Sequence, residues 1–333
     1  MKGTKSRTHG LATPNRDRQT VLVTGGAGFI GSHVCAALAS AGRRVLAFDN
    51  LSTGCFPNLP SSASLIVGDI RSEEDLKAAF AREPIDAIVH CAAQTSVERS
   101  MIDPEFDHDV NVRGTWQLAT YAHRAHVRRF VFLSSGGAIY GETHVPATER
   151  SLPAPRSFYG FHKYAAEELV RASGVSAAIL RPSNVYGPRQ RADAEGGVIA
   201  IFAQRLVRGD PLKIHGDGRQ VRDFVHVSGV VAAVLRGMDG EDQVVWNVAS
   251  GQGTTILALS ALLARLLRVE PRLSFGPRRA GDIDSSLLSA ASLLRTGSWP
   301  PPLSLREGLR LTFMEPRTSP PVRSALVAEA SKL

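Results

Sequence analysis

The sequence predicts an α/β fold in which helices cover both faces of a largely parallel sheet. Three observations predict it: short β-branched apolar runs recur through the first half of the chain, helix-period segments separate most of them, and a glycine cluster follows the first run. Strands that alternate with helices in this way form parallel sheets, because each helix carries the chain back to the edge where the previous strand began. The chain has 333 residues, of which 43% are hydrophobic, which is enough to bury one large core or two smaller ones.

The expected elements follow one another in a regular order. The first strand is Thr20 to Thr24 (TVLVT), and a helix-like stretch from Ser32 to Ala41 follows the glycine cluster. The further strand candidates are Arg44 to Phe48, Ser64 to Val67, Ala87 to His90, Arg129 to Leu133 and Ala177 to Leu180. This order predicts a Rossmann-type doubly wound sheet.

The second half of the chain predicts a smaller C-terminal lobe. From Pro182 onward loops with glycine and proline dominate, with two more strand-like runs at Phe224 to Val227 and Val244 to Val248. The expected division is a basic flexible tail at 1–18, a Rossmann domain at 19–181 to which 223–250 returns, a substrate-binding lobe from 182–222 and 251–313, and a loose tail at 314–333.

Composition and charge argue against several classes of protein. The net charge is +8, but half of this excess lies in the first 20 residues, where five basic side chains stand against Asp17, so we expect no nucleic-acid partner. The longest uncharged apolar stretch, near Thr254 to Ala264, is too short to cross a bilayer, and no signal-peptide core follows the first lysines. We therefore expect a cytoplasmic protein with no membrane partner. Cys35, Cys55 and Cys91 have unrelated spacings, which predicts neither a disulfide framework nor a metal site.

The glycine cluster has the spacing of a dinucleotide-binding turn. Thr24-Gly25-Gly26-Ala27-Gly28-Phe29-Ile30-Gly31 gives GxxGxxG between the first strand and the first helix. Backbone N–H groups and the helix dipole at such a turn point at a diphosphate, and glycine lets the phosphates come close. Any tight turn favours glycines, so the assignment depends on the residues that follow.

Asp49 supplies this context at the end of the second strand, roughly twenty residues further on. A carboxylate there can accept both hydroxyls of the adenosine ribose and would repel a 2′-phosphate, so the sequence favours NAD over NADP. Asn50 adds no basic residue, although Arg43 and Arg44 lie nearby in the sequence. After the third strand, Gly68-Asp69-Ile70 offers an acidic and an apolar side chain for adenine, or an ordinary loop cap.

Tyr159 and Lys163 form a candidate catalytic pair in SFYGFHKYAAEEL. Residues four apart on a helix project from the same face. The phenol of a tyrosine is too weak an acid to work as a base at neutral pH, but a neighbouring ammonium group and an oxidised nicotinamide would favour its phenolate.

Taken in order, the motifs resemble those of the extended short-chain dehydrogenases/reductases. They are the glycine turn, Asp49-Asn50-Leu51-Ser52, His90-Cys91-Ala92-Ala93-Gln94, Asn111, Ser134-Ser135 with Tyr140-Gly141, and Tyr159 with Lys163. More narrowly, the chain is similar to the UDP-glucose 4-epimerase group of nucleotide-sugar enzymes over about residues 20 to 312.

The resemblance implies that NAD is the cofactor and that a defined set of residues binds it. These are Gly25, Gly28, Phe29, Ile30 and Gly31 around the diphosphate, Asp49 and Asn50 near the ribose, Asp69 and Ile70 at adenine, and Ala92, Ala93, Gln94, Asn111, Tyr159 and Lys163 along the rest of the cofactor.

The resemblance also implies an isomerase that works on carbohydrate. Tyr159 would take the proton from the C4 hydroxyl of a UDP-sugar while hydride passes to NAD, and the 4-keto sugar would turn over and receive the hydride on its other face. The expected function is therefore NAD-dependent epimerisation at C4. The expected substrate-binding residues are Asn184, Val198, His215, Arg222 and Arg279. Among them, Arg222 and Arg279 have the fork geometry that suits a diphosphate.

One departure from the family pattern concerns the hydroxyl that hydrogen-bonds the reacting group. The family places a Ser or Thr four residues before the tyrosine of the YG pair, and counting back from Tyr140 gives Gly136. Ser135 is one residue earlier, and we expect it to take this role, so it joins Tyr159 and Lys163 as a catalytic candidate.

The sequence leaves two other functions open. A nucleotide-sugar 4,6-dehydratase is the nearer one, although such enzymes need extra acids beside the Ser or Thr, where this chain has Gly137 and Ala138. A non-catalytic NAD-sensing or RNA-binding relative is the other, and the intact Tyr159 and Lys163 argue against it. The identity of the sugar stays open, and a homodimer is expected by analogy with the family.

Overall fold

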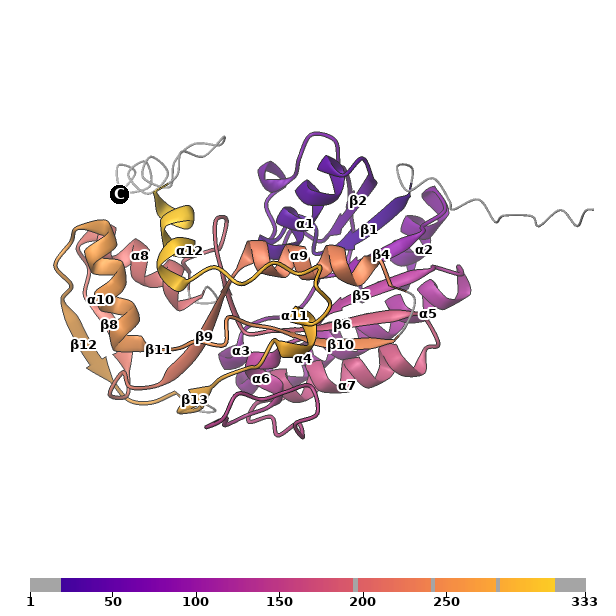
Figure 1. The fold of residues 1–333 in the computed structure, drawn as a ribbon. Helices are drawn as coiled ribbons and strands as arrows, with labels where there is room; N and C mark the ends of the chain where they lie inside the picture. The colour runs from indigo at the N-terminus through magenta and orange to yellow at the C-terminus, as the bar shows by residue number, and fades with distance from the viewer. Residues whose placement is uncertain (1–18, 194–196, 241–242, 280–281, 315–333) are drawn as a thin grey trace, which may run out of the picture.

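The computed structural model describes residues 19–193, 197–240, 243–279 and 282–314. Within these ranges seven strands form one parallel sheet in the order β10-β6-β5-β4-β1-β2-β3 (Figure 1). The strands are β1 (Thr20–Thr24), β2 (Arg44–Asp49), β3 (Ser64–Val67), β4 (Ala87–His90), β5 (Arg129–Leu133), β6 (Ala177–Pro182) and β10 (Val244–Val248). The doubly wound α/β fold predicted from the sequence is confirmed. The predicted tails, 1–18 and 314–333, lie outside the described residues except for Met314.

Helices pack on both faces of this sheet. The long ones are α1 (Phe29–Ser40) and α9 (Val227–Met238) on one face, and α2 (Glu73–Arg82), α5 (Thr115–Arg124) and α7 (Phe158–Ala172) on the other. Successive strand residues point to opposite faces, so Val21 and Val23 of β1 pack with α1 and α9, whereas Leu22 packs with α2 and α5. The result is two buried apolar layers, one on each side of the sheet.

Shorter helical elements lie near the ends of the strands. They are a 3₁₀ turn η2 (Phe56–Asn58), α3 (Val97–Ile102), α4 (Pro104–His108), a π-helical segment η3 (Asp109–Gly114) and α6 (Gly136–Ile139). Wide π-helical turns occur frequently at functional sites, and this one carries Asn111.

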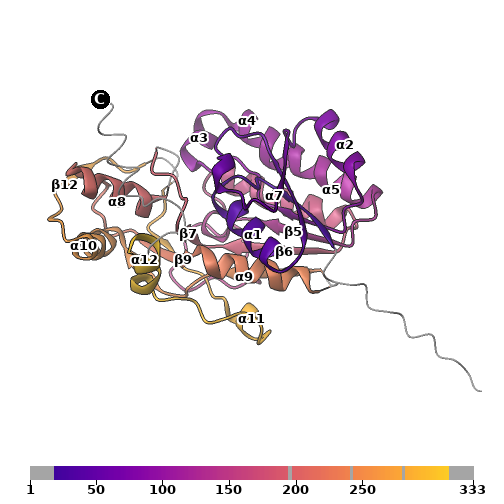
Figure 2. The same ribbon diagram turned by 90° about the horizontal axis from the view of Figure 1, so that it is seen from above.

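A smaller lobe lies to one side of the large sheet, as the view in Figure 2 shows for α8, α10 and α12. Its elements are β7 (Asn184–Tyr186), α8 (Val198–Arg208), β8 (Leu212–His215), β9 (Val221–His226), β11 (Gly253–Thr255), α10 (Ile256–Leu267), β12 (Leu273–Gly276), β13 (Ser285–Ser286) and α12 (Leu305–Phe313). β9 is the central strand and pairs with β7, β11 and β13. A separate core that includes Phe202, Leu206 and Leu263 packs the lobe together.

The structure corrects several boundaries of the predicted elements. The first helix begins at Phe29, not Ser32, because the glycine turn already ends at Gly28. The strand predicted at 224–227 runs over Val221–His226, and Val227 begins α9 because the His226 ring caps this helix by accepting the Ser228 N–H.

Two segments depart from the expected division into a domain and a lobe. Residues 223–226 belong to β9 in the sheet of the lobe, although the sequence suggested that they return to the large domain. Conversely, Leu288 and Trp299 pack into the core on the α9 face of the large sheet, and α11 (Ala291–Leu294) lies beside β10 (Figure 1). The chain therefore crosses between the two parts more often than the sequence suggested, and the exact domain division remains a prediction.

Two further features concern only the part of the chain that the structure describes. None of its helices is both long enough and apolar enough to span a membrane. No three His, Cys, Asp or Glu side chains gather there as metal ligands would, and Cys35, Cys55 and Cys91 are free thiols.

Candidate active site

A cavity of about 1450 Å³ opens at the carboxyl ends of the strands of the large sheet. β1 lies between β2 and β4 at this edge, so the strand order reverses there, and doubly wound sheets bind ligands at such a point. The loops that follow β1 to β4 form one wall, and Asn184, Val198 and Phe224 from the lobe contribute to the other. The volume exceeds the roughly 300–1,000 Å³ of an ordinary small-molecule pocket, so there is room for more than one small ligand.

The glycine turn lines the cavity at the start of α1. Gly25 has a φ of +64°, and a Cβ at this position would lie 2.7 Å from the backbone nitrogen of Ala92. A Cβ on Gly31 would overlap the carbonyl oxygen of Gly25, so the helix can approach the turn only with glycine there. No side chain caps α1, which leaves the N–H groups of its first turn for an anionic ligand. Gly25, Gly28, Phe29, Ile30 and Gly31 all line the cavity, as the sequence indicated.

Asp49 lies at the end of β2 with its side chain at the edge of the cavity. One carboxylate oxygen accepts the Ala27 N–H at 2.9 Å and the other accepts the Leu51 N–H at 2.8 Å, which fixes the orientation of the group. Neither Arg43 nor Arg44 lines the cavity, because Arg43 bonds to Gln19 and Arg44 pairs with Glu83. The negative charge of Asp49 is therefore not offset by either arginine, which favours a ribose without a 2′-phosphate.

Asp69 and Ile70 line the same end of the cavity. Asp69 accepts hydrogen bonds from Asn50 Nδ2 (2.9 Å) and from Arg71 Nε (3.0 Å) and Nη2 (2.8 Å). Burial acts to raise the pKa of Asp69, but these hydrogen bonds outweigh it and lower the pKa to about 2. The carboxylate also accepts the Arg71 N–H, so it is a loop cap and a cavity residue at once.

Tyr159 and Lys163 lie on one face of α7 and both line the cavity. Ser157 fixes the start of this helix, because its hydroxyl accepts the Gly160 N–H at 3.2 Å. Burial raises the pKa of Tyr159 to about 12, while the hydrogen bond with Ser135 acts in the opposite direction. Burial lowers the pKa of Lys163 to about 8, against the carboxylates of Glu167 and Asp107, which raise it. At neutral pH the protein by itself therefore holds a neutral phenol beside a cation.

Ser135, not Gly136, faces Tyr159. Ser135 lines the cavity, and its side chain acts to lower the pKa of Tyr159, whereas Gly136 begins α6 and does not line the cavity. A Cβ on Gly136 would lie 2.5 Å from a methyl carbon of Leu288 and 2.8 Å from the carbonyl oxygen of Arg181. The position reached by the family spacing thus has no room for a side chain, and the structure brings the preceding serine to the tyrosine.

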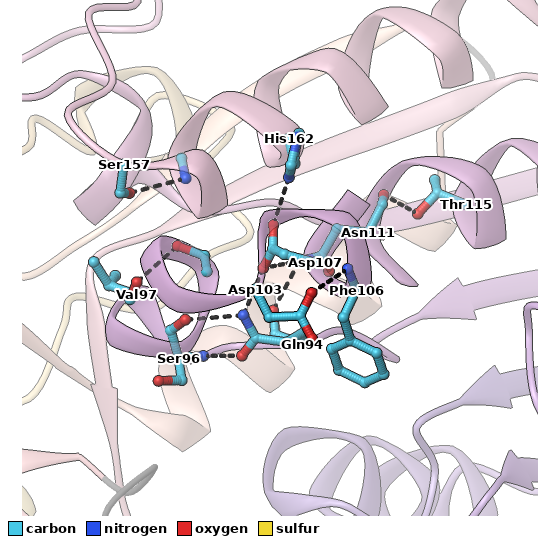
Figure 3. Close-up of polar contacts among 12 residues, drawn as sticks. Gln94, Ser96, Val97, Asp103, Phe106, Asp107, Asn111, Thr115, Ser157 and His162 are labelled. Carbon is cyan, nitrogen blue, oxygen red and sulfur yellow. Dashed lines mark hydrogen bonds and ion pairs between the residues drawn. The ribbon is translucent and has the colours of Figure 1, made fainter. Parts of the chain in front are cut away.

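A buried polar cluster supports the wall formed by Ala92, Ala93 and Gln94 (Figure 3). At its centre the fully buried carboxylate of Asp107 accepts hydrogen bonds from Gln94 Nε2 (2.5 Å), Asn111 Nδ2 (3.1 Å) and His162 Nδ1 (2.6 Å). Asn111 also donates to the Gln94 carbonyl oxygen at 2.9 Å. Asn111 does not itself line the cavity, so it acts on the cavity wall from behind.

The substrate candidates from the lobe fall into two groups. Asn184, at the start of β7, and Val198, at the start of α8, line the cavity, and Asn184 Nδ2 donates to the Asp223 carbonyl oxygen at 3.0 Å. His215, Arg222 and Arg279 do not line the cavity. The His215 ring bonds to the carbonyl oxygen of Pro277 (3.2 Å), Arg222 forms an ion pair with Asp282, and the side chain of Arg279 is exposed. The structure therefore brings together only part of the predicted substrate site.

Several cavity residues were missed by sequence reasoning. They are Ser52, Thr53, Arg71, Arg99, Phe106, Arg189, Gln190 and Arg191. Arg71 and Arg99 lie over the ring of Phe106, at 5.2 and 4.1 Å from its centroid, in a cation–π arrangement. Arg99 and Phe106 lie in the short helices α3 and α4, and the other residues come from loops. None of these segments is long enough to show a periodic pattern in the sequence.

Comparison with known proteins gives a consistent picture. The model of the NAD dependent epimerase/dehydratase family matches residues 21–249. The UDP-glucose 4-epimerase of Mycolicibacterium smegmatis is 38% identical, over 87% of this chain and 96% of its own. The solved structure of the Thermus thermophilus UDP-glucose 4-epimerase with NAD has a TM-score of 0.85 at 37% identity, over 88% of this chain and 97% of its own. The Thermotoga maritima UDP-glucose 4-epimerase with UDP-glucose has a TM-score of 0.84 at 40% identity, with the same coverage.

Proposed function

This chain belongs to the NAD-dependent epimerase/dehydratase family, and we propose that it interconverts UDP-glucose and its C4 epimer, with NAD as a cofactor that is regenerated in each turnover. The observation that carries the proposal is the placement of Tyr159 and Ser135 at one cavity that also contains a glycine turn and Asp49.

The residues of this cavity fit NAD. The uncapped start of α1 suits a diphosphate, and the fixed carboxylate of Asp49 suits a ribose diol. Bound NAD supplies a hydride acceptor and donor to the sugar carbon. The glycine turn and Asp49 would hold the adenosine diphosphate half, and Gln94 and Lys163 line the same cavity as Tyr159.

Tyr159 is the acid and base of the proposed reaction. Its phenolate accepts the proton of the C4 hydroxyl, and the same proton returns to the sugar oxygen at the end of the cycle. Lys163 holds a positive charge one helical turn away and lowers the cost of the phenolate, while Ser135 donates a hydrogen bond to the reacting oxygen. Because one group removes and returns the proton, no net acid or base is consumed.

Epimerisation fits the cavity better than dehydration. Among the residues that the structure describes, the carboxylates that line it are Asp49, Asp69 and Asp193. Asp49 ends β2, Asp69 follows β3, and Asp193 is paired with Arg191. None of these three hydrogen-bonds to Tyr159 or Ser135, and the residues after Ser135 are glycine, glycine and alanine. Elimination of water needs an additional acid and base next to the sugar, and the described residues of this cavity do not provide one.

We propose further that the protein is a cytoplasmic homodimer and that it has no nucleic-acid partner. Exposed apolar side chains on neighbouring helices, Ile102 of α3, Trp116 of α5 and Phe161 of α7, support an interface between two copies. Sedimentation velocity measures the assembly, and a monomer at all concentrations would contradict this part.

The experiment that tests the activity is incubation of the purified full chain with UDP-glucose, UDP-N-acetylglucosamine and UDP-glucuronate in separate samples, with and without added NAD. Products are followed by NMR. We expect the C4 epimer of UDP-glucose to form without net NADH. Tyr159→Phe should lower turnover by about a thousandfold and leave UDP binding intact. A keto-deoxy product would instead indicate a dehydratase, and turnover unchanged by Tyr159→Phe would contradict the mechanism.

A further inference from the structure

Arg189 occupies an unusual backbone position at the boundary between the lobe and the large domain. It lies between β7 and α8, lines the cavity, and has a φ of +69°. A residue with a side chain in this left-handed region costs about 1 kcal/mol or more, and such strain persists where the surrounding structure holds it for a purpose. The conformation directs the chain of the lobe toward α1.

Two contacts attach this segment to the first turns of α1. Arg189 Nη1 donates to the Ser32 hydroxyl oxygen at 3.2 Å, and His33 Nε2 donates to the carbonyl oxygen of Pro188 at 2.9 Å. Both α1 residues follow the glycine turn directly. The guanidinium therefore lies beside the helix end that the diphosphate of a dinucleotide would occupy.

The charge of Arg189 has no acidic partner among the described residues. Other arginines of the cavity differ, since Arg71 is paired with Asp69 and Arg191 with Asp193. Arg189 is half-buried, and this burial lowers its pKa because the charged form loses hydration. The positive end of the α1 dipole lies next to it, so two positive groups face the same part of the cavity. An anionic ligand between them would offset both.

We propose that Arg189 binds the diphosphate of NAD, so that the lobe and the large domain hold the cofactor together. The inference rests on NAD being the cofactor of the proposed function and adds a residue from the lobe to its binding site. Among the described residues, the guanidinium of Arg189 donates to the Ser32 hydroxyl through one nitrogen, and its other planar donors suit two neighbouring phosphates. Retention of the cofactor matters here, because the hydride removed from the sugar has to return from the same NAD.

The test is titration calorimetry of the full chain, freed of bound nucleotide, with NAD and with UDP in separate runs. The variants are Arg189→Ala, Arg189→Lys and the control Arg295→Ala, in which an exposed arginine that also donates to a serine hydroxyl (3.1 Å) is removed. We expect Arg189→Ala to weaken NAD binding by about tenfold to a hundredfold. Arg189→Lys should recover part of the loss, since it keeps the charge and loses the fork. UDP binding and the control should change less than about twofold.

Three results would overturn the inference. If Arg189→Ala binds NAD with unchanged affinity, the arginine only connects the lobe to α1 through its hydrogen bond with Ser32. An equal or larger loss for UDP means that it serves the diphosphate of the substrate. If Ser32→Ala reproduces the full loss of NAD affinity, the hydrogen bond between Arg189 and Ser32, and not the charge of Arg189, supports NAD binding. NAD binding is measured here without turnover, so an inactive protein with Arg189-dependent NAD binding would contradict the proposed function and leave this inference standing.

Discussion

The two halves of the cavity differ in how far they are prepared for a ligand. On the cofactor side, backbone groups define the site: the glycine turn is closely packed, and two N–H groups hold the carboxylate of Asp49. On the substrate side, the two arginines expected to bind a diphosphate lie outside the cavity: Arg222 is neutralised by Asp282, and the side chain of Arg279 is exposed. A preorganised site loses little conformational entropy when it binds its cofactor. A site made from loops and side chains can instead adapt to a sugar that turns over between two hydride transfers.

The largest effect is expected from filling the glycine turn. In Gly31→Ala the new methyl group would overlap the carbonyl oxygen of Gly25, so we expect a loss of about 2 to 3 kcal/mol in unfolding free energy and more than about tenfold in NAD affinity. Denaturant unfolding and NAD titration measure the two. Gly229→Ala is the control, because Gly229 also lies in a long helix, α9, and a Cβ there would make only an ordinary contact, 3.4 Å from a methyl carbon of Val225. A variant with normal NAD affinity would show that the cofactor half adapts after all.

The next largest effect is expected at Ser135. We expect Ser135→Ala to lower kcat by about tenfold to a hundredfold, because the reacting oxygen loses a hydrogen bond in the transition state. Gly136→Ser added to this variant should not restore the rate, since Leu288 and the carbonyl oxygen of Arg181 leave no space there. Steady-state kinetics on both variants decide the point. Wild-type kcat in Ser135→Ala would mean that the hydroxyl has no part in the chemistry.

Arg222 tests whether the substrate half rearranges. If the lobe closes on the diphosphate of UDP, Arg222 has to exchange Asp282 for the ligand. We then expect Arg222→Ala to weaken UDP binding by about tenfold and to leave NAD binding unchanged. Arg219→Ala, with a side chain 85% exposed, is the matched control. Equal UDP affinity in Arg222→Ala and the wild type would mean that the ion pair with Asp282 is purely structural.

The last prediction concerns the charge of Lys163, whose effect is the smallest within any one pH unit. Its pKa is lowered by burial to about 8 in the folded protein, from an ordinary value of 10.5. Between these two values the unfolded chain binds more protons, so the stability of the folded state rises with pH in this window, by up to about 1 kcal/mol per pH unit. Lys163→Met should remove this rise, which urea unfolding at pH 8, 9 and 10 would detect. If the unfolding free energies of the wild type and Lys163→Met changed with pH in the same way, the pKa of Lys163 would be close to its ordinary value.

The large sheet was accessible to prediction because its signals are local. Thr20 to Thr24 and Ala87 to His90 have the predicted boundaries, since short β-branched runs between turn residues specify a buried parallel strand on their own. The start of the first helix was displaced by three residues, because capping by a bare glycine turn gives no side-chain signal. Where the lobe joins the large domain, β9 and α9 adjoin at His226 with no intervening loop, and the apolar pattern continues across the junction.

The sequence by itself determined the doubly wound fold, the glycine turn, Asp49, and the Tyr159 and Lys163 pair, because each depends on residues that are neighbours along the chain or one helical turn apart. Only the tertiary structure decided that Leu288 fills the space at Gly136, that Asp282 neutralises Arg222, and that Arg189 reaches Ser32 across 157 positions of sequence. The physical reason is the distance along the chain over which each kind of interaction acts. Turn geometry and helix periodicity act between neighbours in the chain, whereas steric exclusion and ion pairing act between whichever residues the fold brings together.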